Sequence, residues 1–151
     1  KKIGVSIYNF NLNNILIKKY KFDIIQVPFN LIDRRLMNKS TLRKLKNKKI
    51  EIHARSIFLK GLLLYEKPPK KFKKWNFLWK KINKFKTENK TNNLEICLNF
   101  IQKFDFADKF IIGIDNIEHL KEIIKILKIN QNLRIPLVKC GDKKLINPTL
   151  W

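Results

Sequence analysis

The sequence predicts an α/β fold built on a parallel sheet, for three reasons. Four runs are apolar and rich in β-branched residues, as is typical of strands buried on both faces. Amphipathic helical patterns separate these runs, and such alternation produces right-handed βαβ units. Polar side chains follow each run, and the carboxyl ends of the strands build the active site of a parallel α/β barrel. We therefore expect a fold of the parallel (β/α)8 TIM-barrel type, of which this chain holds about four βα units, a half barrel.

The expected strands follow one another at intervals long enough for a crossover connection. They are "IGVSI" at 3–7, "FDIIQV" at 22–27, "IEIHAR" at 50–55 and "KFIIG" at 109–113. The polar residues at or just beyond their carboxyl ends are Ser6, Tyr8, Asn9, Gln26, Asn30, Arg55, Ser56, Asp115 and Asn116. No G-x-G-x-x-G follows the first run, so a Rossmann dinucleotide site is not supported.

Helical spacing of apolar residues predicts two long helices and two shorter ones. The first long helix has apolar residues at Leu94, Cys97, Leu98, Ile101 and Phe104, and the second at Ile117, Leu120, Ile124 and Leu127. Each set makes one apolar stripe, the kind that faces a core. The shorter helices are expected around Leu42 and Leu45, and around Ile15 and Leu16 after the Asn-rich cap region 11–14.

Length and composition indicate one folded domain. The chain has 151 residues, of which 44% are hydrophobic and 11% aromatic, enough for one ordinary core. We expect a single domain over 1–151, in which 130–151 forms a C-terminal tail without strong periodicity. The Pro- and Lys-rich stretch 66–74 is interpreted as a solvated loop rather than a phosphate-binding patch.

The formal net charge of +22 first suggests a nucleic-acid binder. The charge is mostly Lys, spread along the whole chain together with many Asn, Ile and Phe. This mixture is typical of a bias towards AT-rich codons, which selects no ligand. A basic nucleic-acid-binding protein is therefore the less favoured alternative, and we expect no specific nucleic-acid partner.

The few cysteines and histidines predict neither a metal site nor a disulfide. Cys97 and Cys140 lie far apart, and His53 and His119 do not bring them into a metal-ligand spacing. Two isolated thiols are typical of a reduced, cytoplasmic protein. The longest apolar stretch, "IFLKGLLLY", is too short to span a membrane, so no membrane partner is expected.

Five motifs, in this order, resemble the second half of the aldo/keto reductase family. They are "IGVSIYN", "DIIQVPFNLIDRRL", "KIEIHARSIFLKGLLL", "IIGIDNIEHLKEI" and "LINPTLW". The resemblance covers nearly the whole chain and implies a (β/α)8 oxidoreductase that reduces small carbonyl compounds with a nicotinamide cofactor. The four expected strands would correspond to the fifth to eighth strands of that barrel.

The resemblance also implies what this chain lacks. The family's catalytic Asp, Tyr, Lys and His come from the first half of the barrel, and no position here matches them. We therefore assign no catalytic residue, interpret His53 as a core or barrel-lining residue, and expect no reductase activity from this chain alone. A non-catalytic half-barrel subunit or binding module is the alternative, pairing with a complementary N-terminal half or with itself.

At the nicotinamide end of the family's cofactor site, Ser6 and Gln26 match the two side chains that hydrogen-bond the carboxamide. The alternatives are a satisfied strand-end hydroxyl for Ser6 and a buried amide bonded to backbone for Gln26. Arg55 stands where many members place an aromatic residue that stacks on the nicotinamide, and a guanidinium plane can also stack on a ring.

At the phosphate end, two further segments match the family. Ser56, Phe58, Leu59 and Gly61 match the loop along the pyrophosphate, and Gly113, Asp115, Asn116 and His119 match the segment that holds the adenosine phosphate. Members that prefer NADP place Lys and Arg in this second segment. A carboxylate at Asp115 repels the 2′-phosphate, so the cofactor is NADP or NAD. Asp115 and Asn116 would also serve as a helix cap.

Overall fold

Four short parallel strands lie side by side in the order of the chain. The structure, a computed structural model, describes residues 1–10, 18–129 and 134–151. The strands are β1 (Gly4–Ser6), β2 (Ile24–Pro28), β3 (Glu51–Arg55) and β4 (Lys109–Phe110), in the order β1-β2-β3-β4. All three pairings are parallel. The expected four-stranded parallel arrangement of a half barrel is confirmed.

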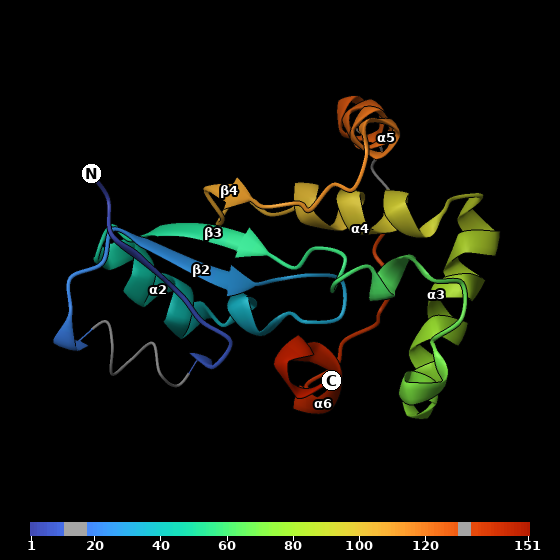
Figure 1. The fold of residues 1–151 in the computed structure, drawn as a ribbon, viewed down its shortest axis with the longest axis horizontal. Helices are drawn as coiled ribbons and strands as arrows, with labels where there is room; N and C mark the ends of the chain where they lie inside the picture. Colours follow the sequence, from blue (N-terminus) through green and yellow to red (C-terminus); the bar gives the residue numbers. More distant parts are fainter. Residues whose placement is uncertain (11–17, 130–133) are drawn as a thin grey trace.

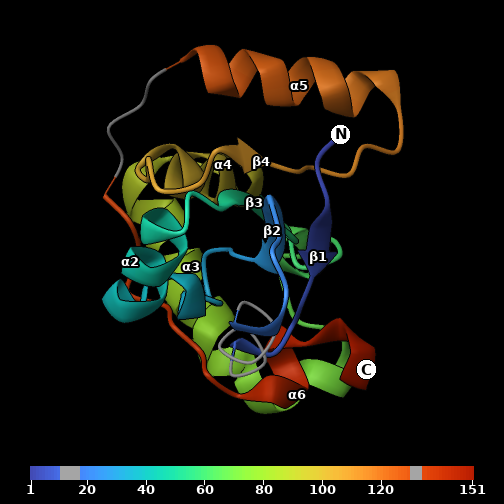
Figure 2. The same cartoon turned by 90° about the vertical axis from the view of Figure 1, so that its left-hand side faces the viewer.

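The helices begin and end as follows. They are α2 (Lys39–Asn47), α3 (Asn76–Asn89), α4 (Asn93–Gln102), α5 (Ile117–Lys128) and α6 (Lys143–Ile146), with 3-10 turns η1 (Arg35–Met37), η2 (Leu62–Leu64), η3 (Lys70–Trp75) and η4 (Pro148–Leu150). Figure 1 shows α3 and α4 beyond the carboxyl ends of the strands. Figure 2 shows α2, α3 and α4 together on one side of the sheet. The helix expected around Ile15 and Leu16 lies outside the described residues.

The helix-covered side of the sheet is apolar and the other side is polar. Side chains alternate along a strand, and β2 and β3 bury Ile25, Val27, Ile52 and Ala54. Glu51, His53 and Arg55 occupy the alternate positions of β3 and are only half-buried. The half-buried face therefore carries the polar residues of the expected site, as in the interior of a barrel.

The helix α5 differs from its expected packing. Its capped N-terminus at Asn116 and its length agree with the sequence pattern. However, Ile117, Ile124 and Leu127 of the predicted stripe are 54%, 43% and 36% exposed, whereas Ile123 and Ile126 are buried. Leu120 of the predicted stripe is half-buried. The apolar residues of α5 therefore make one broad face, and the helix contacts α4 while burying the edge of this face that carries Ile123 and Ile126.

The C-terminal segment packs back onto the core. The backbone N–H of Cys140 donates to the carbonyl of Ile32 at 2.9 Å, and Val138 and Leu145 are fully buried. Trp151 packs edge-on against Phe72 of η3, with ring centroids 4.8 Å apart. Residues 134–151 thus share the core of the strands and helices. The interpretation of 66–74 as a solvated loop is accordingly incomplete, because η3 buries Phe72 while its lysines are exposed.

Candidate cofactor site

Strand register places the predicted carboxamide partners next to each other. Ser6 of β1 is paired with Gln26 of β2, which is paired in turn with His53 of β3. The Ser6 hydroxyl lies 3.3 Å from Oε1 of Gln26, close enough to donate a hydrogen bond. Ser6 is exposed, so both polar groups lie at an accessible face of the sheet.

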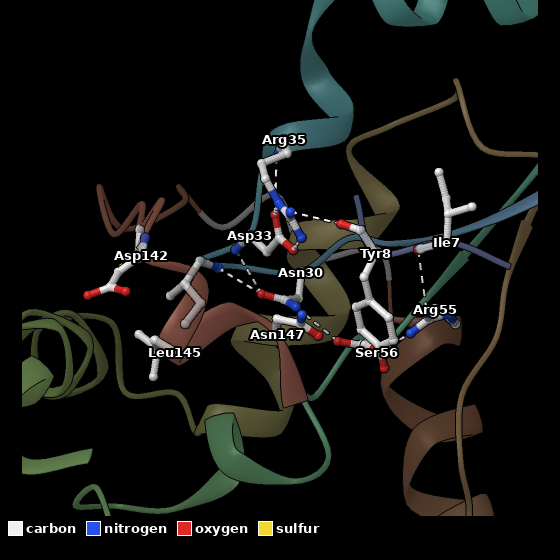
Figure 3. A network of polar contacts seen from close by, with 12 residues as sticks. Ile7, Tyr8, Asn30, Asp33, Arg35, Arg55, Ser56, Asp142, Leu145 and Asn147 are labelled. Carbon is white, nitrogen blue, oxygen red and sulfur yellow. Dashed lines mark hydrogen bonds and ion pairs between the residues drawn. The ribbon is translucent and has the colours of Figure 1, made fainter. Parts of the chain in front are cut away.

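Arg55 joins this pair from the end of β3. Its Nε donates to the Ser6 hydroxyl at 3.2 Å, and its two terminal nitrogens donate to the Ser56 hydroxyl at 3.1 Å and to the carbonyl of Ile7 at 3.3 Å. The guanidinium lies over the ring of Tyr8, 4.1 Å from its centroid (Figure 3). In this structure the guanidinium stacks on a tyrosine of the same chain, and the stacking of Arg55 on a nicotinamide stays a prediction.

Asn30 holds the turn that follows β3. Its side-chain NH2 donates to the carbonyl of Ser56 at 3.0 Å, and its Oδ1 accepts from the backbone N–H groups of Ile32 and Asp33 at 3.1 and 2.9 Å. Asn30 is fully buried, and Ser56 has a positive φ of 59°. Such a conformation persists only where the surroundings hold it, and Asn30 supplies that support.

A pocket of about 700 Å³ opens beside this turn. Segments far apart in the sequence line it: the turn after β3, the N-terminus of α4, and the residues between β4 and the first turns of α5. The predicted site residues on its wall are Ser56, Phe58, Gly61, Gly113, Asp115 and His119. Its size is ordinary for a cofactor or ligand site.

Two glycines leave room in this pocket. A Cβ added to Gly61 or to Gly113 would meet no atom within 4 Å. Leu59, Lys60 and Gly61 have φ values of 49°, 52° and 79° in succession, and backbone N–H groups in such turns form concave anion sites. The side chain of Leu59 is fully buried, and its backbone N–H donates to the carbonyl of Ser56 at 2.9 Å, so Leu59 holds the turn rather than lining the pocket. Lys60 supplies a positive charge on this wall, whereas the carboxylates of Glu66, Asp115 and Glu122 line the same pocket.

The N-terminus of α5 adds the second wall. Asn116 caps the helix by accepting from the backbone N–H of His119 at 2.8 Å. The His119 ring lies 4.0 Å from the Asp115 carboxylate, and the two side chains are 53% and 94% exposed. A capped helix N-terminus favours anions, whereas the Asp115 carboxylate opposes them.

Side chains from α3 and α4 fix the loop at residues 64–66, which also borders the pocket. Asn93 donates to the carbonyls of Leu64 and Tyr65 at 3.1 and 3.0 Å, Trp79 donates to Tyr65 at 3.1 Å, and Asn83 donates to Glu66 at 2.9 Å. Leu64, Glu66 and Asn93 line the pocket. Three consecutive carbonyls are therefore bonded, which holds the pocket wall in one shape.

Deeper on the polar face, Glu51 forms a charged cluster. It accepts from His53 at 2.7 Å, pairs with Lys109 at 3.5 Å, and also pairs with Lys2. The hydrogen bond from His53, followed by that from Lys2, lowers the pKa of Glu51 to about 2. His53 thus lines the polar face, as the sequence predicts, and no group of ligands for a metal ion occurs in 1–10, 18–129 and 134–151.

The predicted residues therefore form two neighbouring groups, one at Ser6 and Gln26 and one around the pocket, and Arg55 and Ser56 join them. The sequence analysis includes Tyr8 and Asn30 among the polar residues at the strand ends but gives them no role, and it does not single out Asn93. The structural role of Asn30 could have been predicted, because this residue follows a buried strand and is itself surrounded by apolar residues. The roles of Tyr8 and Asn93 depend on contacts between distant segments, which leave no local signal.

Known proteins provide an independent comparison. The aldo/keto reductase family matches residues 1–134. Curated protein sequences give no match. Aldo-keto reductase AKR11C1 from Bacillus halodurans has a similar structure: its holo form matches with a TM-score of 0.64 and 15% identity, over 89% of this chain and 45% of that chain. The apo form of the same enzyme matches with a TM-score of 0.61 and 15% identity, over 87% and 46%.

At this identity the structural likeness shows the fold, and the chain spans less than half the length of that enzyme. No helix in the described part of the chain is long and apolar enough to cross a bilayer. The family match covers most of the sequence, and the parallel sheet with polar residues at its strand ends agrees with it. This chain therefore belongs to the aldo/keto reductase family.

Proposed function

We propose that this chain is the C-terminal, cofactor-binding half of an aldo/keto reductase barrel. The observation that carries the proposal is the pocket of about 700 Å³, which brings the turn at 56–61 together with the segment at 113–119. These segments are the two that the family resemblance assigns to the phosphates of a nicotinamide cofactor. Their meeting in one pocket supports the proposed cofactor, NADP or NAD.

The proposed roles follow from position. Ser6 and Gln26 would hold the carboxamide at two points and so fix the face of the ring. The turn at Ser56 and Gly61 and the N-terminus of α5 would hold the diphosphate and the adenosine. When bound, the reduced cofactor supplies a hydride to the carbonyl carbon of a small substrate. Since no residue here matches the family's catalytic set, we expect no turnover from the chain alone.

Two matched glycine variants test the proposal. Gly113 lines the pocket, whereas Gly141 does not, and a Cβ at either position would meet no atom within 4 Å. Gly113→Val should weaken binding of ADP and NADH by about tenfold, measured by calorimetry, while Gly141→Val should bind as the unmodified chain does. If ADP and NADH do not bind the unmodified chain, the proposed function is wrong.

The proposed location is the cytoplasm. The two cysteines are free thiols, and Cys97 is buried. Reduced thiols are typical of that compartment, so a fractionation that found the protein in an oxidising compartment would contradict this assignment.

A second candidate function, a half-barrel subunit, is favoured by the exposed face of α5. Its residues Ile117, Ile124 and Leu127 are exposed, and β1 and β4 each pair with only one strand of the sheet described here. Since the related enzyme is about twice as long as the matched region, we propose that a complementary half barrel covers this face. Uncovered strand edges and apolar faces associate readily.

Light scattering after size-exclusion chromatography tests this second candidate. In the absence of a complementary half, we expect the mass to rise with concentration. Ile124→Ser should reduce the association, whereas Lys125→Ser, one position along the same helix, should leave it unchanged. A chain that stays monomeric at every concentration would contradict the subunit role.

A further inference from the structure

Positive charge is concentrated in η3 and α3. Ten of the 24 residues at 67–90 are lysines and only Glu88 is acidic, whereas the whole chain has 34 basic residues among 151. A composition bias spread evenly along the chain would place about half as many basic residues in this stretch. The local excess therefore needs an explanation of its own.

Buried side chains fix the direction in which these lysines point. The residues of η3 and α3 that are buried in the core are Phe72, Trp75, Leu78, Trp79 and Ile82. The lysines between them are exposed, namely Lys70, Lys71, Lys73, Lys74, Lys80, Lys81 and Lys84. The stretch that the sequence suggested to be a solvated loop thus presents its lysines from an ordered support.

One face of α3 adds an aromatic ring to this charge. Phe77, Lys80, Lys81 and Lys84 have the spacing i, i+3, i+4 and i+7, which places them together on one side of a helix. The side chain of Phe77 is 53% exposed. We call these four residues and the exposed lysines of η3 the lysine face.

The surroundings of the lysine face come from this chain itself. Phe72 packs against Trp151, with ring centroids 4.8 Å apart, and Lys74 pairs with Asp142 at 3.4 Å. The sheet edges that could pair with a second half barrel are β1 and β4. Figure 1 shows α3 at the end of the molecule opposite the N-terminus, beyond the carboxyl ends of the strands. A half barrel that paired with these edges would leave the outward side of α3 exposed.

The other basic helix, α2, differs in two respects. Basic residues at its C-terminal end line a cavity of about 670 Å³ together with three carboxylates, those of Glu51, Asp105 and Asp108. The helix also contains no aromatic residue. The combination of exposed lysines with an exposed ring is therefore a property of α3, and α2 provides a control of similar charge.

This combination matches single-stranded nucleic acid. Lysines bind the phosphates and release counter-ions, and unpaired bases stack on exposed aromatic rings. The bases of a duplex are already stacked on one another and would not reach Phe77. An anionic membrane matches less well, because the apolar side of α3 is buried in the core and leaves Phe77 alone on the lysine face to insert.

We propose that the lysine face binds single-stranded nucleic acid, with lysines on the phosphates and Phe77 stacked on a base. Neither contact distinguishes one base sequence from another, so the expectation of no specific nucleic-acid partner is unchanged. The lysine face lies outside the pocket assigned to the cofactor. The proposal is therefore independent of the cofactor role.

The test is fluorescence anisotropy with a labelled oligouridylate of about 12 nucleotides. Lys80→Gln, Lys81→Gln and Lys84→Gln together should weaken binding about tenfold at about 0.1 M salt and reduce the slope of log K against log salt by about 2. The matched control combines Lys39→Gln, Lys46→Gln and Lys48→Gln, which are exposed in and beside α2. This control should change binding by less than about twofold, because salt screens distant charges.

Phe77→Ala separates stacking from charge. It should weaken binding of the oligouridylate about fivefold or more, and leave both the salt slope and the binding of a duplex of the same length unchanged. Because Phe77 is exposed, the fold should be retained, which the urea midpoint checks.

Three results would overturn the proposal. Equal weakening by the two triple variants would show general charge attraction, and a Phe77→Ala variant that binds the oligouridylate normally would remove the stacking contact. Binding to phosphatidylserine vesicles without binding to the oligouridylate would assign the lysine face to a membrane instead.

Discussion

Replacing Asn30 by alanine should lower the free energy of unfolding by about 3 kcal/mol, because three hydrogen bonds of about 1 kcal/mol each are lost from a fully buried side chain. The turn at Ser56 would lose its tether, and its positive φ is strained without support. We therefore also expect ADP to bind about tenfold more weakly. With an m-value of about 2 kcal/mol per M, the urea midpoint should fall by about 1.5 M.

Asn38→Ala is the matched control. Asn38 is exposed, caps α2 by accepting from the backbone N–H and the hydroxyl of Thr41 at 3.0 and 3.3 Å, and does not line the pocket. Its loss should cost about 1 kcal/mol and leave ADP binding unchanged. Urea denaturation and calorimetry measure both quantities. An Asn30→Ala variant as stable as Asn38→Ala, or one that binds ADP normally, would refute the role assigned to Asn30.

Three further predictions concern charge and reactivity. The pKa of Glu51 is lowered from 4.5 to about 2, so its stabilising contribution is complete above the unfolded pKa and is lost as pH falls from about 4.5 towards 2. Over this pH range the urea midpoint should therefore fall less steeply for Glu51→Gln than for the unmodified chain. Equal slopes for the two proteins would contradict a stabilising charged cluster at Glu51. Burial raises the pKa of Cys97 to about 12 and also raises that of Cys140, which is partly exposed. Iodoacetamide near pH 8 should therefore modify Cys140 first, as mass spectrometry would show, and early modification of Cys97 would argue against its burial. Asp115→Lys should increase the affinity for 2′,5′-ADP relative to that for ADP. Calorimetry should be carried out at low salt, because the side chain is 94% exposed and its charge is screened by salt. An unchanged ratio of the two affinities would place the 2′-phosphate elsewhere.

The strands were predictable because their signal is local. The runs at 22–27 and 50–55 predict β2 and β3 to within two residues at each end, since continuous apolar runs with β-branched residues favour buried strands. The last run, 109–113, predicts a strand longer than β4, which ends at Phe110. The length of an edge strand depends on its neighbours, which the run itself does not specify.

The packing of α5 was not predictable from periodicity. Ile117, Ile124 and Leu127 have the spacing of a buried stripe, but the residues that are buried, Ile123 and Ile126, lie at the edge of this broad apolar face, on a helix that contacts α4. A sequence pattern shows that a face is apolar, whereas only the tertiary partner decides which face is buried.

The candidate site was predictable in its residues more than in its contacts. Strand-end positions predict that Ser6, Gln26 and Arg55 share one edge, since parallel strands align their carboxyl ends. That Arg55 donates to Ser6 while stacking on Tyr8 depends on side-chain geometry between β1 and β3. Sequence spacing carries no information about this geometry.

The pairing of Ser6 with Gln26 and of Gln26 with His53 links ligand recognition to strand alignment. A shift of β1 by one residue would turn Ser6 towards the helices and bring Val5 or Ile7 to the polar face. The strand has only three residues, and a Cβ at Gly4 would lie 3.0 Å from the Cβ and carbonyl oxygen of Ile24. A side chain at this position would push β1 away from β2 by a few tenths of an ångström and so move the Ser6 hydroxyl away from Gln26, which makes ligand recognition depend on the glycine two residues before the hydroxyl.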